Sequence, residues 1–202
     1  MADKKGGQGP KKKELFLEGA IRTIQKVGTH QLNSYSVAKE LGVSQSSFFY
    51  HFETQADFYR ELVAHITRIN EGIVKELTRG MKTVTAWQKL ETYIAGNLLW
   101  TEKYPEQFDV LSYGMQHCGH DPKIVELINE AFEGGYKKVY NIVSGGFAEG
   151  EFKLALPIQS LVFCLHKAIV GAMFHLQNLP ERKNAHVKMQ ADILLMARRL
   201  LT

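Results

Sequence analysis

The chain has 202 residues, of which 45% are hydrophobic and 23% are charged, and its net charge is +4. These values are ordinary for a globular protein and exclude wholesale disorder. No apolar run approaches the ~20 residues of a membrane span, and no apolar segment follows the basic start as in a signal peptide. The two cysteines, Cys118 and Cys164, form no disulfide framework, so we expect a cytoplasmic protein with no membrane partner.

The positive charge is concentrated at the start of the chain. Residues 1–13 carry five lysines and one aspartate, whereas the basic and acidic residues of 14–202 balance. Such a Gly/Lys/Pro segment predicts a disordered basic tail. Its lysines could contact the phosphates of a nucleic acid, because such contacts release counterions, or the tail could simply keep the protein soluble. The candidates nearest the folded part are Lys11, Lys12 and Lys13.

After the tail, apolar residues recur every three or four positions, which predicts successive helices and almost no strand. Asparagine, serine or threonine residues precede several of these segments as N-caps, and prolines begin three of them. We expect an all-α fold of about nine helices, with a small domain over 14–61 and a larger one over 62–202. The expected helices cover residues 12–27, 33–41, 44–52, 54–79, 85–103, 105–115, 122–144, 157–177 and 184–201.

Residues 33–52 have the pattern of a helix-turn-helix. A first helix, "NSYSVAKEL", is followed by a turn, "GVS", and by a second helix, "QSSFFYHF". In this arrangement the second helix enters the major groove of DNA, with its N-terminal residues nearest the base edges. The alternative is an amphipathic helical hairpin without a role on DNA, because the surrounding residues are not basic.

The aromatic residues of the second helix separate onto two faces. Phe48 and Phe52 are four positions apart and share one face of a helix, so we expect both in the core. Phe49 and Tyr50 then point toward the partner. Phe48 and Phe52 would then pack in the core, while Phe49 and Tyr50 would serve recognition.

The polar residues of this helix are candidates for DNA contacts. Gln45 could bond an adenine edge through both amide atoms, and Ser46 or Ser47 could reach bases or phosphates. Tyr50 could combine a hydrogen bond to phosphate with contact to a thymine methyl, and His51 could add a further phosphate contact.

Residues 15–65 resemble the tetracycline-repressor (TetR) family of bacterial transcriptional regulators. The resemblance rests on Val37-Ala38, on the turn Gly42-Val43-Ser44 and on Phe48-Phe49-Tyr50-His51-Phe52. A shorter likeness, "AEGEF" at 148–152, is to a turn common in the second half of these proteins. The resemblance implies a homodimeric regulator that binds double-stranded operator DNA. It also implies a repressor released by a small-molecule effector.

Three positions depart from the family pattern. Phe49 stands where a phosphate-binding tyrosine is usual, Gln55 where a lysine opens the next helix, and Tyr35 where many members have arginine. We therefore expect weaker binding per half-site, which the basic tail could offset by entering a minor groove. The candidate DNA contacts are Ser34, Tyr35, Ser44, Gln45, Ser46, Ser47, Phe49, Tyr50, His51, Gln55, Lys11, Lys12 and Lys13.

The resemblance places the dimer interface on the last two helices, 157–177 and 184–201. Both carry apolar residues at helical spacing, and small residues would allow close approach, although the same stripes could be internal core. The predicted interface residues are Leu161, Leu165, Ala168, Ala172, Leu176, Val187 and Leu194.

Aromatic residues recur along the C-terminal domain and suggest an effector cavity. Together they would line a roomy, largely apolar site for an apolar or aromatic effector, although each ring by itself could be core. The resemblance implies that binding there moves the fourth helix and separates the two recognition helices. The candidate lining residues are Trp100, Tyr104, Phe108, Tyr113, Phe132, Tyr136, Tyr140, Phe163, His166 and Phe174.

The segment "MQHCGHD" at 115–121 brings His117, Cys118 and His120 together. A metal- or redox-sensing regulator on the same scaffold is therefore one alternative. The spacing matches no zinc pattern and a helix-ending loop explains it, so no metal site is expected. A regulator-like interaction or ligand-binding protein with weakened DNA binding is the other alternative. No nucleophile elbow or phosphate-binding glycine loop indicates an enzyme, and no cofactor is expected.

Overall fold

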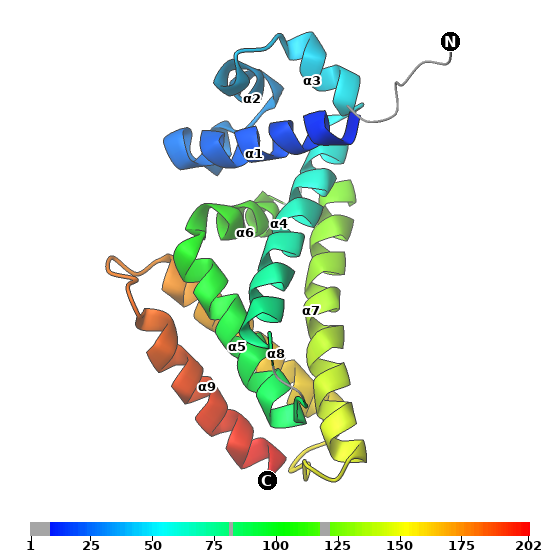
Figure 1. The fold of residues 1–202 in the computed structure, drawn as a ribbon, viewed down its shortest axis with the longest axis vertical. Helices are drawn as coiled ribbons and strands as arrows, with labels where there is room; N and C mark the ends of the chain where they lie inside the picture. The colour runs from blue at the N-terminus through cyan, green and yellow to red at the C-terminus, as the bar shows by residue number, and fades with distance from the viewer. Residues whose placement is uncertain (1–8, 81–82, 118–121) are drawn as a thin grey trace. The chain divides into compact units, whose positions relative to one another are not determined.

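The computed structural model of the protein describes residues 9–80, 83–117 and 122–202, and these fold into helices without a strand (Figure 1). Every expected helix is present, so the prediction of an all-α fold with an N-terminal helix-turn-helix is confirmed. A 3-10 turn precedes the second helix. The elements of the described part are α1 (Gly9–Val27), η1 (Thr29–Gln31), α2 (Ser34–Leu41), α3 (Gln45–His51), α4 (Gln55–Leu77), α5 (Ala86–Lys103), α6 (Pro105–His117), α7 (Pro122–Ala148), α8 (Ile158–Gln177) and α9 (Ala185–Leu201).

Helix α1 begins earlier than the sequence suggests. The charge pattern predicts a disordered tail through residue 13, but residues 9–13 form the first turns of α1. Pro10 suits such a position because its ring fixes a helical φ and its missing N–H would find no acceptor within the helix. Residues 9–11, expected in the tail, are therefore helical, as are residues 12 and 13, which the helical pattern had also included in the first helix. Residues 1–8 lie outside the described part.

Helix α7 continues beyond its expected end, through a glycine pair to Ala148. Here glycine serves close packing: a Cβ on Gly146 would lie 2.4 Å from the ring of Phe152 and 2.7 Å from the Cβ of Ala86. The chain turns only at Gly150, whose φ of 74° is a left-handed conformation that glycine adopts without steric cost.

The chain packs as two units whose division lies inside α4. The expected boundary after residue 61 lies in the same helix. Helix α6 packs in the first unit, although the sequence pattern places it in the larger domain. The first unit comprises Met1–Thr67 and Glu106–Leu127, and the second comprises Arg68–Pro105 and Ile128–Thr202.

A buried hydrogen bond shows how α6 joins the first unit. The hydroxyl of Tyr59 on α4 donates to the backbone carbonyl of Val110 on α6. Both residues are buried, and a buried hydroxyl is costly unless it is paired. Phe108 of α6 is likewise only 1% exposed. No local sequence pattern indicates this contact, because it joins residues far apart in the chain.

Aromatic rings form the core of the first unit. The ring of Phe48 on α3 lies 5.9 Å from that of Phe16 on α1 and 4.9 Å from that of Phe58 on α4. Phe52 meets the same two rings at 6.1 and 5.1 Å. These edge-to-face contacts stabilise the core beyond the area they bury. They also fix the orientation of α3 about its own axis.

Local capping sets the turn between α2 and α3. Asn33 accepts a hydrogen bond from the backbone N–H of Ser36 at 2.9 Å, and the Ser36 hydroxyl accepts from the N–H of Asn33 at 3.0 Å. Gly42 ends α2 with a φ of 66°, in the left-handed region. The hydroxyl of Ser44 then accepts from the N–H of Ser47 and begins α3. Short-range chemistry therefore defines this turn.

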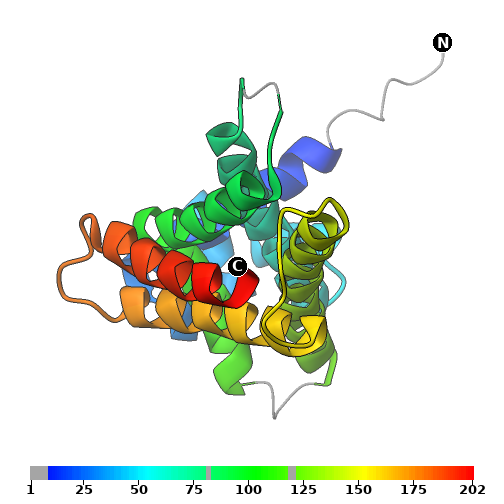
Figure 2. The same cartoon turned by 90° about the horizontal axis from the view of Figure 1, so that it is seen from below.

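In the second unit, α5, α8 and α9 pack against one another (Figure 2). Glu151, in the turn after α7, accepts hydrogen bonds from the N–H groups of Ala86 and Trp87 at 2.7 and 2.9 Å. These are the first N–H groups of α5, which have no acceptor within the helix. The "AEGEF" turn therefore closes the N-terminus of α5 from a distant part of the chain.

Glu102 makes a similar contact at the start of α9. Its carboxylate accepts from the N–H groups of Asn184 and His186 at 3.2 and 3.3 Å, and lies 2.7 Å from the Nδ1 of His186. Burial alone would raise the pKa of Glu102, but the hydrogen bonds from His186 and Asn184 lower it below its ordinary value. The carboxylate consequently stays charged and holds α9 to α5.

Candidate nucleic-acid interface and a groove in the second unit

Helix α3 presents one aromatic face to the core and the other to solvent. Phe48 and Phe52 are 0% and 1% exposed, whereas Phe49 and Tyr50 are 48% and 85% exposed. The predicted division of the rings is confirmed. Two large rings on a short helix are thus available to a partner, held there by the buried pair.

The start of α3 carries a short network of hydroxyls. The Oγ atoms of Ser44 and Ser46 lie 2.8 Å apart and share a hydrogen bond. Ser44 also accepts from the N–H of Ser47. Ser44 and Ser46 are exposed and Ser47 is half-buried. This end of α3 therefore offers hydroxyl groups in orientations fixed by the helix cap.

Gln45 is held by a residue of the preceding helix. Its Nε2 donates to the Oγ of Ser34 on α2 at 2.8 Å. Ser34 is only 7% exposed, while Gln45 is exposed. Both were expected to contact DNA, but the structure gives Ser34 a different position, beneath the amide of Gln45. The other amide hydrogen and the Oε1 of Gln45 make no hydrogen bond to the residues that the structure describes, so both could meet an adenine edge.

The remaining candidates lie around this helix. Tyr35 on α2 is 62% exposed, and Gln55, the first residue of α4, is exposed. Lys12 is exposed. Lys13 binds Glu61 at 3.0 Å and lies 5.5 Å from the ring centre of Phe52. Lys13 is therefore engaged within the unit, and the side chain of Lys11 lies outside the described part.

His51, at the end of α3, lies near two aromatic rings and two lysines. Its imidazole lies 5.3 Å from the ring of Phe16 and 5.1 Å from that of Tyr50. Burial, and then the charges of Lys12 and Lys13, lower the pKa of His51. The imidazole is consequently neutral at physiological pH, so it can meet a phosphate only as an N–H donor.

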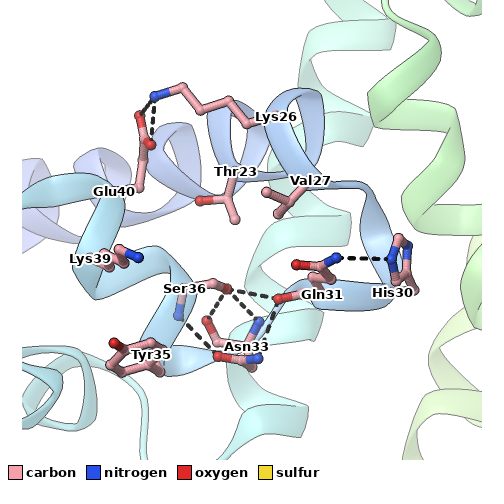
Figure 3. A pocket seen from close by; sticks show the side chains of 10 residues that line it. All are labelled: Thr23, Lys26, Val27, His30, Gln31, Asn33, Tyr35, Ser36, Lys39 and Glu40. Atoms are coloured by element: carbon pink, nitrogen blue, oxygen red, sulfur yellow. Dashed lines mark hydrogen bonds and ion pairs between the residues drawn. The ribbon is translucent and has the colours of Figure 1, made fainter.

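A cavity of about 630 Å³ lies beside the start of α2, and the sequence pattern did not indicate it (Figure 3). Lys26 reaches across it to Glu40, at 2.8 and 2.7 Å from the two carboxylate oxygens, and lowers the pKa of that carboxyl. Lys39 makes no ion pair within the described residues. The cavity is lined by Thr23, Lys26, Val27, His30, Gln31, Asn33, Tyr35, Ser36, Lys39 and Glu40.

A groove in the second unit consists of two adjoining cavities of about 300 and 290 Å³. Val74, Tyr93 and Lys138 line both of them. The Nζ of Lys138 on α7 lies 2.6 Å from the Oε1 of Glu71 on α4. No sequence pattern indicates this groove, because charged residues at helical spacing usually indicate a solvated face. Its other lining residues are Asn70, Glu71, Lys75, Thr78, Lys89, Thr92, Asn141 and Ile142.

Comparison with known proteins supports the helix-turn-helix. Residues 16–62 match the sequence model of the bacterial regulatory proteins of the tetR family. The match covers the helix-turn-helix segment, about a quarter of the chain, and this segment is similar to that of the tetR family. The matched segment begins within α1, contains α2 and α3, and ends within α4. No curated protein matches the sequence.

Solved structures of transcriptional regulators share the fold over nearly the whole chain. A regulator from Haloarcula marismortui aligns with a TM-score of 0.83 at 14% identity, over 96% of this chain and 100% of that one. A regulator from Saccharomonospora viridis in complex with choline gives 0.79 at 20% identity, over 96% and 99%. FadR from Bacillus subtilis in complex with stearoyl-CoA gives 0.66 at 18% identity, over 91% and 96%.

The aromatic residues predicted to line an effector cavity have several different environments. Phe132, Tyr136 and His166 meet in the second unit, with ring centres 6.4 and 6.2 Å from the imidazole. Burial, and then the charge of Lys167, lower the pKa of His166. The predicted residues do not line the cavities described above. Phe108 and Tyr113 belong to the first unit, Trp100 is buried, Tyr140 and Phe174 are half-buried, and Tyr104 and Phe163 are 37% and 55% exposed.

Part of the predicted tetR-type dimer interface is internal core. Leu161, Leu165 and Leu176 are each 0% exposed within the single chain, so their side chains are not available to a second subunit. The helical stripe faces α5 and α9 because burying leucine there stabilises the unit itself. Ala168, Ala172 and Leu194 are half-buried, and Val187 is 55% exposed.

The histidines and cysteine of the "MQHCGHD" segment cannot be placed. Cys118 and His120 lie outside the described residues, as does the side chain of His117. Within the described residues, no group of three or more histidine, cysteine, aspartate or glutamate side chains could hold a metal ion. Cys164 is exposed on α8. A metal or redox role for this segment therefore stays a prediction.

Proposed function

We propose that the protein is a cytoplasmic, homodimeric repressor that binds a specific operator and is released from it by a small-molecule effector. One observation carries the proposal: α3 exposes Tyr50, Phe49 and its polar N-terminal end, while buried rings hold its other face. Recognition helices of this class read base edges with their N-terminal residues. Regulators of the tetR family are DNA-binding proteins without enzymatic activity, and we assign this chain no catalysis.

The exposed surface of α8 and α9 supports dimerisation. Phe163, Val187 and Leu195 are 55%, 55% and 60% exposed, which is unusual for large apolar side chains on adjoining helices. Among the described residues, α8 has the length and hydropathy of a membrane span, with only 33% of its apolar window buried. A helix at an interface between subunits is likewise apolar and only partly buried within its own chain. A second copy of the chain would cover this surface and supply a second recognition helix.

The groove of the second unit is our candidate for the effector site. It is the concave, partly apolar site with convergent polar groups that small ligands usually occupy. Similar folds hold choline in one protein and stearoyl-CoA in another. The groove is lined in part by α4, which also contributes residues to the DNA-binding unit. A ligand that favours one position of α4 would shift the population between DNA-binding and released states.

Selection from a random pool of double-stranded DNA tests the proposal. We expect a palindromic consensus, since a two-fold dimer reads two half-sites about one helical turn apart. Binding should weaken steeply with salt, because phosphate contacts release counterions. Analytical ultracentrifugation of the protein with the selected DNA should show two chains per site. Enrichment of no sequence would contradict the proposal.

A specific observation favours a second candidate, a regulator-like protein with weakened DNA binding that recognises another partner. Phe49 has no hydroxyl, Gln55 has no charge, and Lys13 is engaged by Glu61. The first two each remove a phosphate anchor from the expected DNA surface, and Glu61 competes with phosphate for Lys13. Under this alternative, the selection would yield weak, sequence-independent binding, and the exposed Tyr50 would serve a protein contact instead.

A further inference from the structure

The groove of the second unit has an excess of positive charge. Lys75, Lys89 and Lys138 line its two cavities, and Glu71 is the acidic residue of the lining. Lys75 and Lys89 form no ion pair in the part of the chain that the structure describes. Lys138 forms an ion pair with Glu71 at 2.6 Å, whereas the charges of Lys75 and Lys89 act on Glu71 and Glu151 from farther away. Such a surface attracts anions and repels cations.

The walls between these charges include apolar groups. Val74 lines both cavities from α4, and Ile142 lines one of them from α7. Tyr93 lines both from α5, and burial raises its pKa to about 12. Its hydroxyl donates to the backbone carbonyl of Gly135 at 3.4 Å, so Tyr93 contributes a largely buried ring to the wall. Apolar walls next to cations suit a molecule with an apolar body and a negatively charged head.

We propose that this groove binds an amphipathic anion with an apolar body and a carboxylate head, and that the head displaces Glu71 from Lys138. The inference rests on the proposed function, because it gives the chemical class of the effector. A quaternary ammonium compound is disfavoured at this site, since it would meet Lys75, Lys89 and Lys138 without a free carboxylate.

The ion pair between Lys138 and Glu71 is suited to displacement. The hydrogen bond from Lys138 lowers the pKa of Glu71, so this carboxylate is charged at neutral pH. Their side chains are nevertheless 43% and 37% exposed, and a pair this open to water is weak. An incoming carboxylate replaces the same charge-assisted hydrogen bond. It gains in addition from burying its apolar body against Val74 and Ile142.

Displacement has a consequence for α4. Glu71 lies on this helix and Lys138 on α7, so their ion pair ties the two helices within the second unit. A ligand that takes Lys138 frees the carboxylate of Glu71 and removes this tie. The helix that carries Glu71 continues into the DNA-binding unit. The head group of the ligand thus acts on α4, the helix that moves in the proposed mechanism.

Three probes of equal chain length and different charge test the inference: decanoate, decanol and decyltrimethylammonium. Binding to the full-length protein is measured by calorimetry without DNA, below the micelle concentration of each probe. We expect decanoate to bind about tenfold or more tightly than decanol, because its charge is attracted by three lysines whereas the hydroxyl of decanol carries no charge. The ammonium probe should bind most weakly. Equal binding of decanoate and decanol, or no binding by decanoate, would overturn the inference.

Substitutions at the ion pair have opposite expected effects. Lys138→Gln should abolish the preference for decanoate over decanol, whereas Glu71→Gln should strengthen decanoate binding several-fold by freeing Lys138. A merely structural role cannot explain tighter binding after a substitution. Lys137→Gln is the matched control, because Lys137 is an exposed neighbour that pairs with Glu133, at 3.6 Å, and does not line the groove. Unchanged binding in both Lys138→Gln and Glu71→Gln would contradict the displacement.

The design separates this inference from the proposed function. Probe binding is measured without DNA, and operator binding is measured separately by selection. If decanoate binds as expected but leaves the operator complex intact, release by an effector is contradicted, while the anion site is supported. If the DNA selection enriches no sequence, the proposed role as a regulator is contradicted. If decanoate binds no more tightly than decanol, only the proposed chemistry of the groove is contradicted.

Discussion

The polar end of α3 and the groove of the second unit are assembled in opposite ways. The candidate DNA contacts Ser44, Gln45 and Tyr50 lie within one short segment, and one helix sets their directions. In the groove, Glu71 and Lys138 lie on different helices, 67 positions apart in the chain. A local pattern can therefore specify the first site, whereas only the packing of helices creates the second. Substitutions at the start of α3 should therefore change DNA recognition directly, whereas substitutions in the groove should act through the contacts between helices.

The largest effect is expected where the recognition helix meets the core. Phe48→Ala removes a ring that is 0% exposed and should lower the free energy of unfolding by about 3–5 kcal/mol. Denaturant titration followed by circular dichroism measures this. Phe49→Ala is the matched control, since that ring is 48% exposed and should cost under about 1 kcal/mol. Similar costs for the two variants would mean that α3 is not anchored by one face.

Leu195→Glu tests whether the exposed apolar surface of α9 joins two subunits. A charge placed there should weaken the dimer about tenfold or more, because it would be buried without a partner. Sedimentation at several protein concentrations gives the dissociation constant. Leu156→Glu is the control, since Leu156 is 41% exposed in the loop before α8. If Leu156→Glu weakens the dimer as much as Leu195→Glu does, the interface lies elsewhere.

A smaller effect is expected for Ser34→Ala, which removes the hydroxyl that holds the amide of Gln45. We expect a loss of about 1–3 kcal/mol of discrimination at one base pair of each half-site, with little change elsewhere. Repeated DNA selection measures the base preference at every position. Gln45→Ala should lose the same preference, and the double variant should lose no more than Gln45→Ala alone. A uniform loss of affinity in Ser34→Ala would instead indicate damage to the fold of the turn.

The smallest effect is expected at the cap of α5 in the second unit. Glu151→Gln weakens the acceptor for two N–H groups and should lower stability by about 1 kcal/mol, as loss of an N-cap does. Glu149→Gln, an exposed neighbour, is the control. Thermal unfolding measures both variants, and equal shifts in Tm would contradict the role of Glu151.

The same carboxylate predicts a pH dependence. The N–H of Trp87 and then that of Ala86 lower the pKa of Glu151. Because the pKa of Glu151 is lower in the folded than in the unfolded state, its contribution to the free energy of unfolding is complete above the ordinary glutamate pKa. It is lost as pH falls through the folded value. The difference in Tm between the wild type and Glu151→Gln should therefore shrink in acid, and a difference independent of pH would contradict this account.

Much of the first unit was predictable from short-range patterns. The spacing of Phe48 and Phe52 indicated a buried face, and the exposed positions of Phe49 and Tyr50 followed from the same helix. The support of Gln45 by Ser34 was not predictable, because it depends on how α2 and α3 cross. In the second unit, helical spacing identified the leucines of α8 but could not distinguish an internal face from an interface. Leu161 and Leu165 proved to be internal.

The sequence by itself determined the helices, the turn at Gly42 and the resemblance of residues 16–62 to the tetR family. Each depends on residues within a few positions of one another, through helical period, capping and the backbone freedom of glycine. Only the tertiary structure decided that α6 packs in the first unit. It also brought Glu71 and Lys138 within 2.6 Å and set the carboxylates of Glu102 and Glu151 at the starts of distant helices. Those contacts join residues remote in the chain, and their geometry depends on the packing of whole helices.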